Sequence, residues 1–177
     1  MMGNKAVWCL VALSAALATA GMAETPADKA RAPRVVRAWE DTVKIDGHDV
    51  YRRVEIVFDY QRGEAFQRTW DASGQLVGEH RAPTPRPSDE ELAEALAIVN
   101  GDLELAPRIR ADQLRLEGGF TLREGAGKPC GQGSRCLQIF ASKPQGEAPS
   151  FRAVVDLVSG QVIYRDLHRW EVEEPTP

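Results

Sequence analysis

The sequence predicts an α+β fold in which an antiparallel sheet packs on one main helix. Residues 54–60, 114–122 and 151–157 alternate apolar and polar side chains, which is typical of strands with one solvated face. Residues 88–100 have instead the apolar spacing of a helix. Turn dipeptides separate the strand-like runs where hairpins need them: Asp46-Gly47, Arg62-Gly63, Ser73-Gly74 and Ser159-Gly160. Because short hairpin turns join antiparallel strands, an antiparallel sheet is the simplest arrangement.

The first 23 residues have the composition of a secretory signal peptide. Lys5 is their only charge, an apolar run follows at residues 6–18, and small residues come after the run. This order predicts cleavage after Ala20 or after Ala23. A membrane span needs about 20 apolar residues, which argues against a retained anchor. We therefore expect a periplasmic or secreted protein with no stable membrane span after cleavage.

The mature chain is expected to form one domain, residues 34–170, between two short flanking segments. Residues 24–33 and 171–177 are rich in proline and charge and lack periodicity, which predicts a disordered lead-in and a flexible tail. Without residues 1–23 the chain keeps 21 basic and 26 acidic residues, a net charge of −5. This mild acidity gives no basic surface for nucleic acid.

The predicted helix has recognisable signals at both ends. Ser88 is placed as the N-cap with Glu91 three residues later, the pattern of a capping box. Gly101 stands just past the periodic segment, where a left-handed C-cap is expected. The apolar stripe between these ends should pack on the sheet; it consists of Leu92, Ala95, Leu96 and Val99.

Two cysteines remain after signal cleavage, Cys130 and Cys136. An even pair in an exported protein predicts a disulfide. In the chain-entropy model, closing so short a loop stabilises the fold by about 2–2.5 kcal/mol. The alternative is a redox couple, but the C-x₅-C spacing differs from the C-x-x-C of thioredoxin-type sites.

Candidate catalytic and metal-binding residues are few. Asp46, His48 and Asp49 offer two carboxylates and an imidazole to a divalent cation. The alternative is a solvated hairpin tip, because Asp-Gly is typical of such a turn and one loop supplies too few ligands for a closed site. His80 at a strand end and His168 in the last strand share no spacing with His48 that indicates a triad. Walker and dinucleotide-binding glycine patterns are missing too. We therefore expect no cofactor, no metal and no catalytic residue.

Candidate binding residues are large or basic side chains on strands. Tryptophan is usually largely buried, so packing in the core or at its edge is the alternative for the tryptophans. Arginines that alternate along strands usually lie on a solvated face with cross-strand partners. The set consists of Trp39, Trp70, Trp170, Arg165 and Arg169.

Two further patterns concern the strands themselves. Gly118-Gly119 within a strand predicts a β-bulge or a point of close packing. Residues 54–76 and 137–162 both follow the order strand, turn, strand ending in Asp, Ser-Gly-Gln turn, strand. Either a hairpin unit was duplicated, or two hairpins converged on the same turn chemistry.

Residues 88–165 resemble the small N-terminal domains of copper amine oxidases and the PepSY-type extracytoplasmic modules. The likeness lies in the acidic-start helix at 90–95, the strand at 114–122 and the Val-Val-Asp-Leu-Val-Ser-Gly-Gln-Val hairpin at 154–162. It implies a cystatin-like fold, with one helix in the curve of an antiparallel sheet. Amine oxidase chemistry is not implied, because neither Asn4 nor Asn100 begins the Asn-Tyr-Asp/Glu motif of the quinone.

These observations favour an exported, non-enzymatic domain that binds a protein or peptide partner in the envelope across a sheet edge or loops. Fold analogy alone is a weak basis for function, so two alternatives remain. One is a small metal-dependent or hydrolytic enzyme that uses His48 or His168 with nearby carboxylates. The other is an envelope structural protein.

Overall fold

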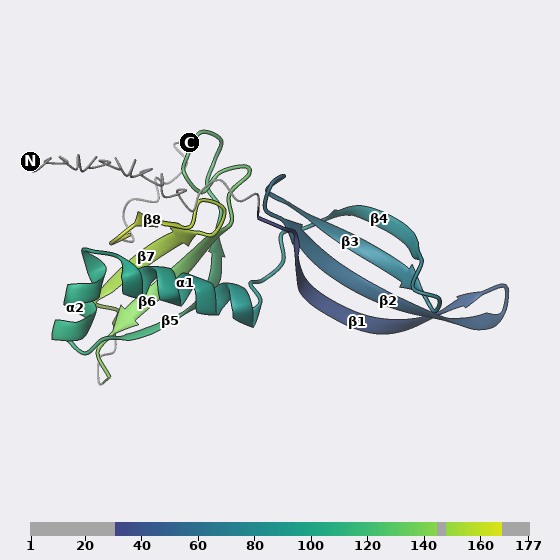
Figure 1. The fold of residues 1–177 in the computed structure, drawn as a ribbon, viewed down its shortest axis with the longest axis horizontal. Coiled ribbons are helices and arrows are strands. Elements are labelled where there is room, and N and C mark those ends of the chain that lie inside the picture. Colours follow the sequence, from purple (N-terminus) through teal and green to yellow (C-terminus); the bar gives the residue numbers. More distant parts are fainter. Residues whose placement is uncertain (1–30, 145–147, 168–177) are drawn as a thin grey trace, which may run out of the picture.

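The computed structural model describes residues 31–144 and 148–167, which form two four-stranded antiparallel sheets and two helices (Figure 1). In both sheets the strands follow chain order. Sheet 1 contains β1 (Arg34–Ile45), β2 (His48–Asp59), β3 (Glu64–Asp71) and β4 (Leu76–Ala82). Sheet 2 contains β5 (Arg115–Leu122), β6 (Cys136–Ser142), β7 (Phe151–Asp156) and β8 (Gln161–Tyr164). The helices α1 (Asp89–Gly101) and α2 (Leu105–Ala111) lie between the sheets in sequence.

The prediction of a mixed fold with antiparallel strands is confirmed, but the strands do not form one curved sheet on one helix. Three prolines, Pro83, Pro85 and Pro87, follow β4. Since proline has no N–H to donate to a ladder, sheet 1 ends there and a second sheet is built after the helices. The sequence prediction also missed α2, whose buried residues are Leu105, Ala106 and Ile109. Seven residues are too few for a helical periodicity to stand out.

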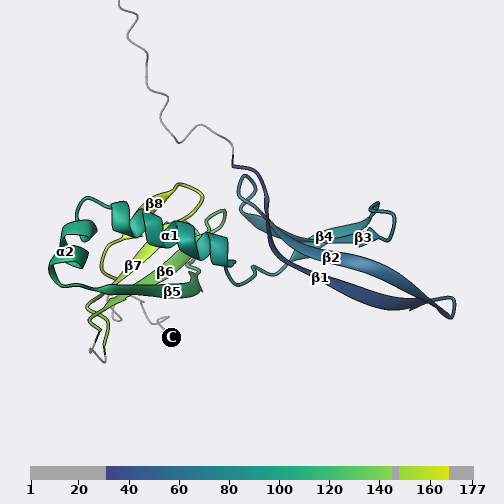
Figure 2. The ribbon, with the colours of Figure 1, turned by 60° about the horizontal axis from the view of Figure 1, so that its bottom comes forward.

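Helix α1 covers one face of sheet 2 and contacts all four of its strands (Figure 2). Ala95 and Val99 of the predicted stripe are fully buried in one cluster with Leu137, Ile139 and Ala153. This cluster extends to Phe58, Tyr60 and Ala65 at the near end of sheet 1. One continuous core therefore joins the two sheets.

The start of α1 agrees with the prediction and its end does not. Ser88 and Glu91 form the capping box, since each side chain accepts a hydrogen bond from the other's backbone N–H. Gly101, however, belongs to the last turn of the helix, and the C-cap is Asp102 in an extended conformation. The Asp102 carboxylate accepts the N–H groups of Glu104 and Leu105 at the start of α2. The connection to the second helix, not a glycine, sets the end of the first.

The predicted bulge and the predicted disulfide are both present. The β5–β6 register shifts between Gly118 and Phe120, and Gly119 has a φ of 120°. A Cβ on Gly118 would lie 2.6 Å from the Ile139 side chain, so this position is also a point of close packing. Cys130 and Cys136 form a buried disulfide with a Cα–Cα distance of 5.7 Å. Among the residues described, no helix is long and apolar enough to cross a membrane.

Sheet 1 extends away from the helical part as a twisted blade, and neither helix lies on it (Figures 1 and 2). No residue of β1 is buried, and most buried residues of β2 are near its end. A single sheet with two open faces cannot make a core of its own. Its contact with sheet 2, through Phe58, Tyr60 and Ala65, adds the buried apolar surface that its open faces lack.

A buried ion pair makes much of that attachment. The Arg135 guanidinium and the Glu91 carboxylate are fully buried and joined by two hydrogen bonds of 2.9 and 2.7 Å. Tyr60 from the end of sheet 1 donates its hydroxyl to the same carboxylate at 2.6 Å. Arg135 also stacks over the Phe58 ring at 4.7 Å and donates to the carbonyl oxygen of Pro85. Helix α1, sheet 1 and the disulfide loop thus meet at one satisfied polar cluster.

In both of the similar segments, residues 54–76 and 137–162, an aspartate carboxylate accepts backbone N–H groups of the turn that follows it. The Asp71 carboxylate accepts the backbone N–H groups of Ser73 and Gln75 after β3. The Asp156 carboxylate accepts the N–H groups of Val158 and Ser159 after β7. In each sheet this turn joins the third strand to the fourth. Duplication and convergence both remain compatible with this agreement.

Candidate functional site

The histidine-containing turn does not assemble a metal site in the part of the chain that is described. Asp46 and Gly47 both have positive φ and form the tip of the β1–β2 hairpin. His48 and Asp49 are consecutive strand residues, so their side chains point to opposite faces. Between residues 31 and 167, apart from 145–147, no three His, Cys, Asp or Glu residues lie close enough to hold a metal ion. His80 lies in β4, and His168 is outside the described residues.

The predicted binding residues are dispersed. Trp39 pairs with Val54 of β2, whereas Trp70 pairs with the next residue, Arg53, so the two indoles lie on opposite faces of sheet 1. Arg165 is far along the chain and pairs with Asp102 at 2.9 Å. Arg169 and Trp170, like the predicted signal peptide and the predicted tail, lie outside the described residues. Of the described members of this set, Trp70 and Arg165 each border a cavity, and only the one beside Trp70 is lined by aromatic rings.

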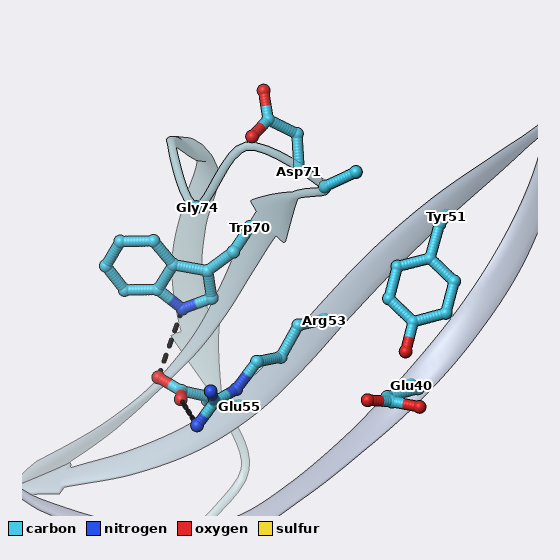
Figure 3. Close-up of a pocket in the computed structure, with 8 residues that line it drawn as sticks. Glu40, Tyr51, Arg53, Glu55, Trp70, Asp71 and Gly74 are labelled. Carbon is cyan, nitrogen blue, oxygen red and sulfur yellow. Dashed lines mark hydrogen bonds and ion pairs between the residues drawn. The ribbon is translucent and has the colours of Figure 1, made fainter.

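Trp70 stands at one side of a shallow cavity of about 450 Å³ on sheet 1, here called the sheet 1 cup (Figure 3). The Tyr51 ring stands at the other side, and Arg53 and Glu55 lie between the two rings. Strands β1, β2 and β3 and the β3–β4 turn supply its lining, which consists of Glu40, Tyr51, Arg53, Glu55, Trp70, Asp71, Ala72 and Gly74.

Strand register explains why these side chains meet. Arg53 is the cross-strand partner of Glu40 on β1 and of Trp70 on β3, so the three side chains share a face. Tyr51 and Glu55 are two residues before and after Arg53 and lie on that face as well. The cup is therefore a direct product of pairing and alternation within the sheet.

The floor of the cup is held by a hydrogen bond and an ion pair to a buried carboxylate. Glu55 is 8% exposed. It accepts the indole N–H of Trp70 at 3.0 Å and forms an ion pair with the Arg53 guanidinium at 2.7 Å. The hydrogen bond to a buried carboxylate positions the Trp70 ring before any ligand arrives, whereas the Arg53 side chain is 60% exposed.

The rim of the cup is acidic and partly aromatic. The Tyr51 side chain is 44% exposed. A hydrogen bond to the Glu40 carboxylate, with smaller contributions from burial and from the Glu40 charge, raises the pKa of Tyr51. The Ser73 hydroxyl, followed by the Gln75 backbone N–H, lowers the pKa of Asp71. At neutral pH the rim thus carries an ionised Asp71 beside a neutral phenol.

The lining of the cup combines aromatic rings with charged groups. It contains no serine, cysteine, histidine or lysine. It supplies two aromatic rings, three carboxylates and one guanidinium. Such a set recognises and holds a ligand by stacking, hydrogen bonds and charge.

Sequence reasoning singled out Trp70 but not Glu40, Tyr51 or Glu55 of the cup. Residues 51, 53 and 55 alternate along β2, a signal that marks one face of a strand but not its partners across the sheet. The buried pair of Arg135 and Glu91 was also missed, because residues 44 positions apart give no local pattern. Glu91 was assigned only its role in the capping box.

No protein-family model matches the chain, and no curated protein matches it.

Proposed function

We propose that the protein is an exported, non-catalytic binding module that receives a peptide segment of a protein partner in the sheet 1 cup. The observation that carries the proposal is the pair of partly exposed rings, Tyr51 and Trp70, on either side of a pre-organised polar floor. Tyrosine and tryptophan are the residues most enriched at the energetic centres of protein interfaces. Both offer a large contact area with few rotatable bonds to immobilise.

The edge of sheet 1 supports a peptide as the occupant. β1 is an edge strand of 12 residues and contributes Glu40 to the cup. An edge strand presents backbone N–H and C=O groups to which an extended segment can add. Side chains of a segment added there would alternate between the two faces, and every second one would lie on the face of the cup.

Export is supported by the signal-like residues 1–23 and by the disulfide of Cys130 and Cys136. The resemblance of residues 88–165 to accessory domains of exported proteins is compatible with a supporting role for sheet 2. In this proposal sheet 2, α1 and α2 form the anchored part, and sheet 1 carries the binding surface.

The proposal is tested by a photo-crosslinking amino acid, p-benzoylphenylalanine, placed at position 51 in cells that export the protein. The matched control places it at Glu117, a position on β5 whose side chain is 71% exposed. We expect a discrete crosslinked protein from position 51, none from position 117, and loss of the crosslink when Trp70→Ala is added to a chain with unchanged circular dichroism. Equal labelling from both positions, or no labelling from position 51, would contradict the proposal.

A further inference from the structure

We infer that the sheet 1 cup takes the cationic end of a lysine or arginine side chain on the partner peptide. The inference rests on the proposed function and specifies the partner's chemistry. It is carried by the charges of the lining, by the lack of a cation–π contact on either ring among the described residues, and by the position of Glu40 at the rim.

The charge of the cup favours a cation. Its lining contains three carboxylates, Glu40, Glu55 and Asp71, and one guanidinium, Arg53, which leaves a formal charge of −2. The Arg53 side chain is 60% exposed, but its guanidinium forms an ion pair with Glu55 at 2.7 Å, which compensates its charge. An acidic side chain entering the cup would meet two further carboxylates at the rim, whereas a basic one would be attracted by both.

Glu40 is the carboxylate best placed to meet an incoming cation. It is exposed, and no ion pair with it is found among the described residues. Figure 3 shows its carboxylate next to the Tyr51 hydroxyl. A cation bound there would touch the aromatic ring and the carboxylate together.

The two rings are available for the same cation. Elsewhere in sheet 1, guanidinium groups lie over aromatic rings, with Arg37 over Trp39 at 5.3 Å and Arg62 over Phe66 at 5.3 Å. Among the described residues, none of the cation–π contacts involves Tyr51 or Trp70. The indole N–H of Trp70 donates to Glu55, which draws negative charge toward the ring and strengthens its attraction for a cation.

Peptide selection tests this inference. Random twelve-residue peptides are displayed and selected on the exported, purified protein, and peptides that also bind the Tyr51→Ala variant are discarded. We expect the retained peptides to share a lysine or arginine. Replacing that residue by acetyl-lysine in the case of lysine, or by citrulline in the case of arginine, should weaken binding by about tenfold, because the ion pair and the cation–π contact are lost together.

A matched pair of variants separates a contact in the cup from a general effect of net charge. Glu40→Gln and Asp41→Asn each remove one negative charge from adjacent positions of β1, but residue 41 lies on the opposite face because it pairs with Arg52. We expect Glu40→Gln to weaken binding of a selected lysine peptide by about two- to fivefold, and Asp41→Asn to leave it unchanged.

The outcomes distinguish the two levels of the proposal. Peptides that need Tyr51 but share no basic residue would overturn the cationic inference and leave the proposed function standing. Equal weakening by Glu40→Gln and Asp41→Asn would also overturn it, since the attraction would then be long-range. If no selected peptide depends on Tyr51 and position 51 gives no crosslink, both the inference and the proposed function fail.

Discussion

Replacing Glu91 by glutamine should lower the free energy of unfolding by about 3–5 kcal/mol, the usual cost of removing one partner from a buried ion pair. Glu91 and Arg135 are both fully buried, so the guanidinium would remain in the core without its counter-ion. Four donors meet the carboxylate, two at each oxygen: the Tyr60 hydroxyl and Arg135 Nε at Oε1, and Arg135 Nη2 and the Ser88 N–H at Oε2. A glutamine has one acceptor oxygen, so in either amide orientation two of these donors face an NH₂ group.

The assay is urea unfolding at pH 7, followed by circular dichroism and by tryptophan fluorescence. A small domain is stable by about 5–15 kcal/mol, so the variant should unfold at a much lower urea concentration or be partly unfolded in buffer. The double variant Glu91→Leu with Arg135→Met provides the control. It should recover most of the loss, because an apolar pair of similar volume avoids a buried, unpaired charge.

This reasoning would be refuted if Glu91→Gln lowered the free energy of unfolding by less than about 1 kcal/mol while the slope of that free energy against urea concentration stayed unchanged. The reasoning would also be refuted if the double variant lost more free energy of unfolding than the two single variants lose together. Either result would mean that water reaches the pair or that sheet 1 is held mainly by other contacts.

Three further predictions concern the same attachment and its surroundings. Burial raises the pKa of Glu91, but the hydrogen bonds and charge of its guanidinium partner outweigh burial and hold that pKa below its usual 4.5. The pair's contribution is therefore complete above about pH 4.5 and lost as pH falls through the lowered value, so acid titration should destabilise the native chain more than Glu91→Gln. Gly63→Ala should lower the free energy of unfolding by more than about 1 kcal/mol, because its φ is +63° and the new Cβ would lie 2.1 Å from a facing backbone atom. Gly74→Ala should lower it less, because its φ of +81° is also positive but the surrounding space is open. Thermal unfolding of the two variants compares them. Replacing Cys130 and Cys136 together by alanine should remove about 2–3 kcal/mol in urea yet leave the native circular dichroism, and cooperative unfolding in buffer would contradict the view that the disulfide supports one loop.

Local signals in the sequence were sufficient for most secondary structure. Alternation predicted strands, and Asp46-Gly47 and Ser73-Gly74 marked the ends of hairpins that the structure contains. The capping box of Ser88 and Glu91 predicted where α1 begins. These features depend on residues within about four positions of each other, which is why a linear chain reveals them.

Such local signals could not predict whether the strands form one sheet or two. Alternation shows that a segment has one buried face, but the same pattern suits one curved sheet or two separate ones. The end of α1 was misplaced for a related reason: Gly101 has the residue type of a C-cap, while Asp102 ends the helix through bonds that start α2. In both cases the deciding contact is made by the next element.

The sequence by itself determined the strands, the main helix, the disulfide pair and the signal-like start of this protein, because each depends on composition or short spacing. The tertiary structure alone decided that Glu91 and Arg135 meet in the core, and that Glu40, Tyr51 and Trp70 border one cup. Pairing register and the docking of one sheet on another bring together residues that are far apart along the chain. That proximity is fixed by the whole fold, not by any local pattern.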